Sequence, residues 1–238
     1  MVGLSFNESK YFNQWTGFTL QWYEQLFQNQ NILNALYNSM IVAIVSTFLS
    51  ILFGFGIALY LFRVKNRFTS FVEKFIYVPI VIPDVTMAAM MLVFFIFLSN
   101  YLEIKLGIAT TIISHTAFNI SFVTVLIGSK LTRKLRVLEE VASDLYANHF
   151  QVIKQVTLPF VMPALLASVI LSFVLSFDEV VISMFVTGPG STTLPVYVFS
   201  MIKKGVTPAV NSVSSLMLIF SLILVTGVLL LSRKDNLK

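Results

Sequence analysis

Long apolar runs dominate the chain and predict helices that cross a lipid bilayer. A membrane-spanning helix needs about 20 mostly apolar residues, and five stretches meet that requirement: residues 39–62, 75–99, 106–129, 158–187 and 206–232. The runs lack the short alternating segments of a membrane β-barrel, and a helix satisfies its own backbone hydrogen bonds in lipid. We therefore expect an all-α, polytopic fold, with residues 1–36 as an extracytoplasmic N-terminal segment and residues 37–238 as one transmembrane domain.

The composition leaves few other classes of protein. Of the 238 residues, 57% are hydrophobic and 11% are charged, against about 25% charged residues in an average soluble domain. A soluble protein of this size has too little interior for so much apolar surface, which excludes soluble enzymes and nucleic-acid-binding modules. The chain contains no cysteine, which excludes disulfides and thiol chemistry. No cofactor and no metal are expected.

The basic residues predict the orientation of the chain in the membrane. Five spans place residues 63–74, residues 130–157 and the C-terminal tail on one side, and these segments hold 12 of the 16 Lys and Arg residues. The other side receives Lys10, Lys105, Lys203 and Lys204. Cytoplasmic loops carry the excess of basic residues, so the N-terminus is expected outside and the C-terminus inside. The net charge of +5 follows from this topology and requires no nucleic-acid partner.

The longest cytoplasmic segment, residues 130–157, contains an amphipathic helix. One face of this helix is formed by Leu138, Val141, Ala142, Leu145 and Tyr146, which follow the spacing of a helical stripe. Acidic residues occupy the opposite face. Periodicity alone also fits a helix resting on lipid headgroups, but such helices usually carry Lys and Arg on their polar face. The acidic face therefore favours docking to a protein.

The same segment resembles the EAA loop of bacterial ABC-importer permeases. That motif reads E-A-A-x-x-x-G, nine variable residues and I-x-L-P, and this chain matches its spacing without a gap from Glu140 to Pro159. The resemblance implies that the loop is the coupling helix that seats in the ATP-hydrolysing subunit. The implied contact residues are Glu140, Ala142, Leu145, Tyr146, Ala147, Leu158 and Pro159. One position departs from the motif: its glycine is Tyr146 here, at a turn where a side chain is poorly tolerated.

The rest of the chain is similar to permease subunits of spermidine/putrescine importers. The similarity rests on Pro83-Asp84, residues 172–181, residues 185–189 and Leu194-Pro195. It implies an ABC type I importer permease-like fold in a bacterial inner (cytoplasmic) membrane. The implied partners are a second permease subunit, two ATP-binding ABC subunits, a periplasmic or extracellular polyamine-binding protein and the polyamine itself. Such permeases have six spans, so the first is expected to be missing from this chain.

Acidic residues inside the predicted spans are candidates for the substrate path. A charge at the bilayer centre costs about 3 kcal/mol or more, and Asp84, Asp178 and Glu179 have no Lys or Arg in their spans. They either stay hydrogen-bonded to neighbouring helices or line a route for a cation. Adjacent helical residues point about 100° apart, which favours Asp178 over Glu179 as the pore-facing acid, with Ser176 nearby. Trp22 fits an interfacial aromatic belt or a cation–π contact with an entering amine.

Several functions are compatible with a helical membrane protein of this kind. The favoured one is the non-catalytic pore subunit of an ATP-driven polyamine importer, and the lack of a G-x-x-x-x-G-K-[ST] loop in the sequence places ATP hydrolysis in another subunit. An importer permease for another substrate is an alternative. An intramembrane aspartyl-type enzyme would need Asp84 and Asp178 to share a proton, although they lie at different depths. A secondary transporter is disfavoured because five spans show no inverted repeat. His115 is expected to be hydrogen-bonded between helices.

Overall fold

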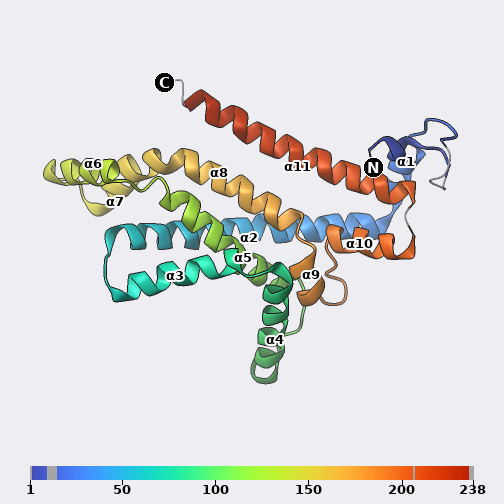
Figure 1. The fold of residues 1–238 in the computed structure, drawn as a ribbon, viewed down its shortest axis with the longest axis horizontal. Coiled ribbons are helices and arrows are strands. Elements are labelled where there is room, and N and C mark those ends of the chain that lie inside the picture. The colour runs from blue at the N-terminus through green and yellow to red at the C-terminus, as the bar shows by residue number, and fades with distance from the viewer. Residues whose placement is uncertain (1, 10–14, 206, 236–238) are drawn as a thin grey trace.

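The described part of the chain forms an elongated helical bundle (Figure 1). The computed structural model describes residues 2–9, 15–205 and 207–235. Within these ranges the only β-structure is an isolated bridge between Asn7 and Phe18. Lys10 and Lys238, which the orientation argument counts, and residue 206, where the fifth expected span begins, lie outside the described residues.

Five of the described helices are long and apolar enough to cross a membrane. They are α2 (Gln30–Arg63), α4 (Asp84–Leu102), α5 (Ile108–Gly128), α8 (Leu158–Phe177) and α11 (Pro208–Asp235). Helix α8 continues the short helices α7 (His149–Val152) and η2 (Ile153–Thr157), so this long helix begins at His149. The prediction of an all-α fold with five apolar spans is confirmed.

Shorter elements lie at the two ends and on the side of the bundle. They are η1 (Gly3–Phe6), α1 (Gln21–Gln28), α3 (Arg67–Val81), α6 (Arg133–Asp144), α9 (Val181–Val186) and α10 (Leu194–Lys204). Helices α6 and α7 form the end that the topology argument places in the cytoplasm, and α1 and α10 lie at the opposite end (Figure 1). Helix α4 projects from the side of the bundle beside α9 (Figure 1).

The expected span at residues 75–99 is divided between two helices. Helix α3 ends at Val81 and α4 begins at Asp84. Pro83 explains the break, because a residue that precedes proline is driven out of the helical region, and Ile82 is extended with φ −73° and ψ 134°. Asp84 is therefore the first residue of a helix, whereas the sequence placed it well inside one.

The expected span at residues 158–187 is interrupted in the same way. Helix α8 ends at Phe177 and α9 begins at Val181, so Asp178 and Glu179 lie in the connection between the two helices. The first span differs at its start. Its helix already begins at Gln30, because the Asn29 side chain accepts hydrogen bonds from the first backbone N–H groups at 3.0 and 3.4 Å and so caps the helix.

Helices α2, α5 and α8 form the centre of the bundle. Helices α2 and α5 approach closely at Gly54, where an added Cβ would lie 2.6 Å from Val123 Cγ1. Small residues allow such close packing between membrane helices. Ala58, Val123 and Ile127 continue this contact as a buried apolar cluster. Two further apolar clusters join α1, α2, α8, α10 and α11, and α4, α5 and α9.

A polar cluster around His115 crosses the middle of the bundle. His115 lies on α5, is 2% exposed, and contacts Ser176 Oγ through Nδ1 at 2.7 Å and Ser183 Oγ through Nε2 at 3.0 Å. Ser176 Oγ also lies 2.9 Å from Ser46 Oγ of α2. One imidazole thus joins both sides of the α8–α9 break and, through Ser176, α2. The prediction that His115 is hydrogen-bonded between helices is confirmed.

Replacing His115 with leucine should destabilise the bundle, because the Ser176 and Ser183 hydroxyls lose a buried partner. A buried hydrogen bond contributes about 0.5–1.5 kcal/mol, so the loss of two should lower the free energy of unfolding by about 1–3 kcal/mol. Thermal unfolding of the purified chain in detergent should show a midpoint several degrees lower. The same substitution at the exposed His149 is the control, and equal midpoints for the two variants would contradict this role of the cluster.

Candidate functional site

The connection between α9 and α10 is irregular backbone held in place by side chains of α2 and α5. The bonds, from donor to acceptor, are Thr110 Oγ1 to Val186 O at 2.8 Å, Asn38 Nδ2 to Gly190 O and Thr192 O at 3.1 Å each, and Leu194 N to Ser39 Oγ at 2.7 Å. Non-helical backbone at membrane depth requires such partners within the protein. The α9–α10 connection is therefore a supported part of the fold.

Asp178 and Glu179 follow each other at this break but bond to different helices. Asp178 Oδ2 accepts a hydrogen bond of 2.9 Å from Ser221 Oγ on α11. Glu179 Oε1 accepts one of 2.9 Å from the backbone N–H of Ile182, in the first turn of α9. Asp178 is exposed, whereas Glu179 is half-buried. The two neighbouring acids thus face separate surroundings.

The break between α3 and α4 lies beside the break between α8 and α9. Helix α4 packs on α9 through an apolar cluster that includes Met87 and Ile182, which brings the start of α4 to the start of α9. Asp84 is exposed at the start of α4, and Glu179 lies two residues before α9 begins. Two carboxylates brought close together disfavour each other's charge, whereas a cation between them would stabilise both. The two breaks therefore bring together acids that the sequence placed on separate spans.

A groove of about 470 Å³ lies between α10 and α11 and has Asp178 in its lining. Its polar members are Asp178, Ser214 and Ser221, and its walls are otherwise apolar: Val180, Pro195, Val198, Phe199, Ile202, Met217, Leu218, Leu222 and Val225. Ser221 was not among the residues predicted from the sequence. Its only signal there is a hydroxyl within an apolar run. The groove offers one carboxylate beside a long apolar surface.

Two residues predicted for the substrate path are buried. Ser176 is 5% exposed, and its hydroxyl contacts His115 and Ser46 rather than Asp178. Trp22 is also 5% exposed, and its indole N–H donates to Asn7 O at 2.7 Å. Both side chains serve packing and hydrogen bonding in this conformation. The partner of Asp178 is Ser221, not Ser176.

The turn after α6 has the left-handed geometry expected at the glycine position of the EAA-like motif. Tyr146 has φ 64°, the left-handed region that favours glycine and costs other residues about 1–2 kcal/mol. The N–H of Tyr146 donates to Ser143 O at 3.0 Å and that of Ala147 to Ala142 O at 3.1 Å, the pair of bonds that defines a Schellman motif. The turn therefore forms with tyrosine in the position of the motif's glycine, at a cost in strain.

Large apolar side chains project from this end of the protein. Leu145 is 75% exposed, Tyr146 97% and Phe150 72%. Exposed apolar groups gathered on one surface mark an interaction site. Phe150 was not predicted, since a single phenylalanine between polar residues has no periodic signal. The other predicted coupling residues differ in exposure: Glu140 and Pro159 are exposed, and Ala142, Ala147 and Leu158 are half-buried.

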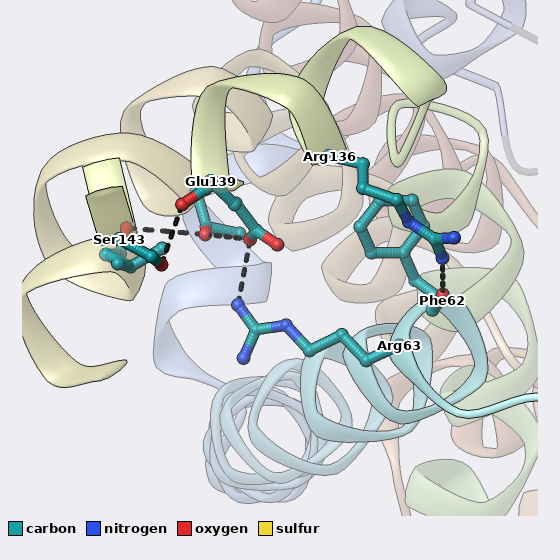
Figure 2. A network of polar contacts seen from close by, with 7 residues as sticks. Phe62, Arg63, Arg136, Glu139 and Ser143 are labelled. Carbon is teal, nitrogen blue, oxygen red and sulfur yellow. Dashed lines mark hydrogen bonds and ion pairs between the residues drawn. The ribbon is translucent and has the colours of Figure 1, made fainter. Parts of the chain in front are cut away.

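The opposite face of α6 is bonded to the end of α2, which the sequence did not predict. Glu139 Oε1 lies 2.8 Å from Arg63 Nη2 (Figure 2). Arg136 Nη2 donates to Phe62 O at 2.7 Å, and its guanidinium lies 5.1 Å from the centre of the Phe62 ring. Glu139 and Arg136 lie one helical turn apart. Helix α6 thus has an exposed face and an anchored face towards α2.

Comparison with known proteins supports a transport role. Residues 46–234 match the family described as a binding-protein-dependent transport system inner membrane component. The chain is 39% identical to the spermidine/putrescine transport system permease protein PotC of Escherichia coli strain K12, over 96% of this chain and 85% of that protein. It is 34% identical to PotC of Haemophilus influenzae, over 99% and 90% of the two chains. It is also 34% identical to the putrescine transport system permease protein PotI of Escherichia coli strain K12, over 92% and 79%.

Solved structures show the same fold. A bacterial ABC transporter involved in the import of the acidic polysaccharide alginate superposes with a TM-score of 0.77, 16% identity and coverage of 98% of this chain and 88% of that chain. The MetNI methionine ABC transporter in inward-facing conformations gives a TM-score of 0.70 and 15% identity, over 85% and 95% of the chains. These likenesses confirm the ABC type I importer permease fold.

Membership of this family defines the part that the chain plays. Permeases of this family contain no ATPase, because ATP is hydrolysed by separate ATP-binding subunits, and a substrate-binding protein works with them. Five apolar helices give this chain the means to pass the membrane several times. The chain therefore belongs to the family of binding-protein-dependent transport system inner membrane components, as a non-catalytic, multi-pass permease subunit of an ABC importer in the inner membrane.

Proposed function

We propose that this permease forms the path of a polyamine importer for spermidine or putrescine. A second permease subunit closes the path, and two copies of the ATP-binding subunit drive it. The observation that carries the proposal is the carboxylate of Asp178 in the lining of an apolar groove, in a chain 39% identical to a spermidine/putrescine permease. A polyamine-binding protein delivers the substrate at the extracytoplasmic end.

The groove fits the chemistry of a polyamine. Alkyl ammonium groups have pKa values near 10, so spermidine enters with about three positive charges. Its amines are separated by methylene groups, which match the apolar walls formed by residues such as Phe199 and Met217. The Asp178 carboxylate supplies a charge-assisted contact for one ammonium group. An anionic or neutral polar substrate gains nothing from this combination.

The acids at the two helix breaks provide the next stage of the route. The negative charges of Asp84 and Glu179 repel each other at the α4–α9 contact. A passing ammonium group removes that repulsion. Alternating access exposes these acids first towards the binding protein and then towards the cytoplasm. Trp22 and Ser176, being buried, support this region in the present conformation and reach the path only if the helices around them move.

The second permease is proposed from the shape of α4. This helix projects from the bundle (Figure 1), and Val93, Phe97 and Tyr101 on it are more than half exposed. Lipid can cover such residues, but the start of the same helix carries Asp84 at the proposed path. A neighbouring permease packed along α4 closes the path on the side that this chain leaves open.

The turn at Tyr146 is the proposed seat of the ATP-binding subunit. Leu145, Tyr146 and Phe150 form its apolar surface, and Glu140 lies beside them on the exposed side of α6. Ala142 and Ala147 shape the turn through their backbone bond at 3.1 Å. Leu158 and Pro159 begin α8 directly after the loop, so movement of the seat reaches a transmembrane helix.

Replacing Asp178 with asparagine should reduce spermidine uptake about tenfold or more, since a contact to a charged group is worth about 1.5–3 kcal/mol. Asp84→Asn should act in the same direction. Uptake of labelled spermidine in cells without their own importer measures both effects, at equal membrane abundance. Glu103→Gln, which neutralises an exposed acid in the α4–α5 connection, is the control. Normal uptake in both aspartate variants would remove the acidic route.

Replacing Leu145 with aspartate should release the ATP-binding subunit. The change places a charge where the proposed interface buries an apolar side chain, which costs several kcal/mol when no partner is present. Co-purification of the ATP-binding subunit should be lost while membrane insertion persists. Gln155→Glu adds the same charge at an exposed position of the same loop and should retain the subunit. Retention in both variants would show that the seat lies elsewhere.

Replacing Tyr146 with glycine should increase substrate-stimulated ATP hydrolysis in the reconstituted complex. The change relieves about 1 kcal/mol or more of left-handed strain and so stabilises the turn that presents Leu145. Ala142→Gly introduces glycine one turn earlier, in helical backbone, and should weaken α6 by about 1 kcal/mol. Opposite effects of the two variants are expected. A lower rate for Tyr146→Gly would mean that the phenol ring itself contacts the ATP-binding subunit.

A further inference from the structure

Glu139 is a mostly buried carboxylate beside an exposed one. Its side chain is 13% exposed, whereas Glu140 is exposed on the side of the proposed seat. Adjacent helical residues point about 100° apart, so these two glutamates cannot serve the same surface. The buried one contacts Arg63 of α2 (Figure 2) and accepts a hydrogen bond from the Thr157 hydroxyl at the end of η2. One carboxylate on α6 therefore joins three elements.

The contact with α2 is reinforced by a second cation. The last carbonyl groups of a helix have no intrahelical partner, and Arg136 donates to one of them, Phe62 O, at 2.7 Å. A positive charge at a helix C-terminus is also favourable for the helix dipole. Arg136 and Glu139, on one face of α6, thus contact two successive residues of α2, Phe62 and Arg63 (Figure 2).

The contact with Thr157 leads to α8. Thr157 is fully buried and is the last residue of η2, a π-helical stretch of five residues. π-Helical turns inside longer helices are frequent at functional positions. Helix α8 begins at the next residue and ends at the break that carries Asp178. The position of Glu139 is therefore linked through this helix to the acidic break.

The two helices that Glu139 links, α2 and α8, also contact each other near the break that carries Asp178. Ser46 of α2 lies 2.9 Å from Ser176 of α8 through their hydroxyls, and Ser39 of α2 accepts from the N–H of Leu194 at 2.7 Å. A displacement of α6 applied to α2 and α8 together acts on the backbone around Asp178 from two sides. A displacement applied to one of them alone would strain the hydrogen bond between Ser46 and Ser176.

We propose that Glu139 is a positioning residue that transmits movement of the ATPase seat to α2 and α8. It joins α6, the end of α2 and the start of α8 into one body, and it makes no contact with the ATP-binding subunit. This inference rests on the proposed seat at Leu145. Glu140, on the other side of the helix, belongs to that seat.

The test measures an ATP-driven change at the acidic break without any transported substrate. The chain has no cysteine, so Val180→Cys places a single thiol in the groove beside Asp178. The rate of its reaction with N-ethylmaleimide is measured in the assembled complex, with and without ATP and vanadate. The variants are Glu139→Gln, Arg63→Gln, their combination, Arg63→Lys and Thr157→Val. Glu73→Gln, at an exposed acid of α3, is the control.

Glu139→Gln should reduce the ATP-driven change in labelling at least about fivefold, the lower range for a coupling between two sites. The ATP-binding subunit should stay bound and keep its basal hydrolysis, which loss of folding would not allow. Arg63→Gln should add little in the Glu139→Gln background, because the two residues act through one contact. Arg63→Lys should keep most of the ATP-driven labelling change that Arg63→Gln loses. Thr157→Val should lose part of that labelling change. Glu73→Gln should behave as the unmodified protein.

Three results would overturn the proposal. They are a full labelling change in Glu139→Gln, additive effects of Arg63→Gln and Glu139→Gln, and release of the ATP-binding subunit by Glu139→Gln, which would make Glu139 part of the seat. Failure of the proposed function is a separate result. It would appear as spermidine uptake unaffected by Asp178→Asn, or as retention of the ATP-binding subunit by Leu145→Asp.

Discussion

The demand of lipid that every backbone polar group find a partner determines the rest of this structure. A continuous helix meets the demand alone, but two of the predicted spans are interrupted, at Ile82–Pro83 and at residues 178–180. At the second interruption the Ile182 N–H donates to Glu179 Oε1, and His115 of α5 joins the two flanks through the hydroxyls of Ser176 and Ser183. Thr110 of α5 and Asn38 of α2 bond to backbone carbonyls at the end of α9 and after it. Polar residues in the middle of apolar helices are thus the support that a broken helix requires.

The broken helices also explain why acids occur in so apolar a chain. A carboxylate within an intact helix would face lipid or the core, whereas Glu179 sits where the first N–H groups of α9 are free and accepts one from Ile182 at 2.9 Å. Its neighbour Asp178 is left to the groove, with Ser221 as its partner. The same break therefore gives one acid a backbone partner within α9 and the other a side-chain partner on α11.

The sequence predicted what depends on local pattern and missed what depends on tertiary contact. The apolar runs predicted the all-α fold, and motif spacing predicted the turn at Tyr146, whose φ of 64° follows from chain geometry near that residue. Pro83 carried the signal for the first break, but hydropathy averaged over the span concealed it. The pairing of Glu139 with Arg63 joins residues 76 apart in the chain. Helical periodicity alone placed Glu139 and Glu140 on the same polar face of the helix.

The two glutamates of α6 face different surroundings. Adjacent helical residues point about 100° apart, which separates two surfaces of the helix. Leu145 and Tyr146 face outward, while Arg136 and Glu139 hold the end of α2. Helices α2 and α8 meet again at Ser46 and Ser176, so this anchor and the polar cluster at His115 lie at two levels of the same pair of helices. The turn after α6 and the acidic break are therefore linked through α2 and α8, which contact each other at Ser46 and Ser176.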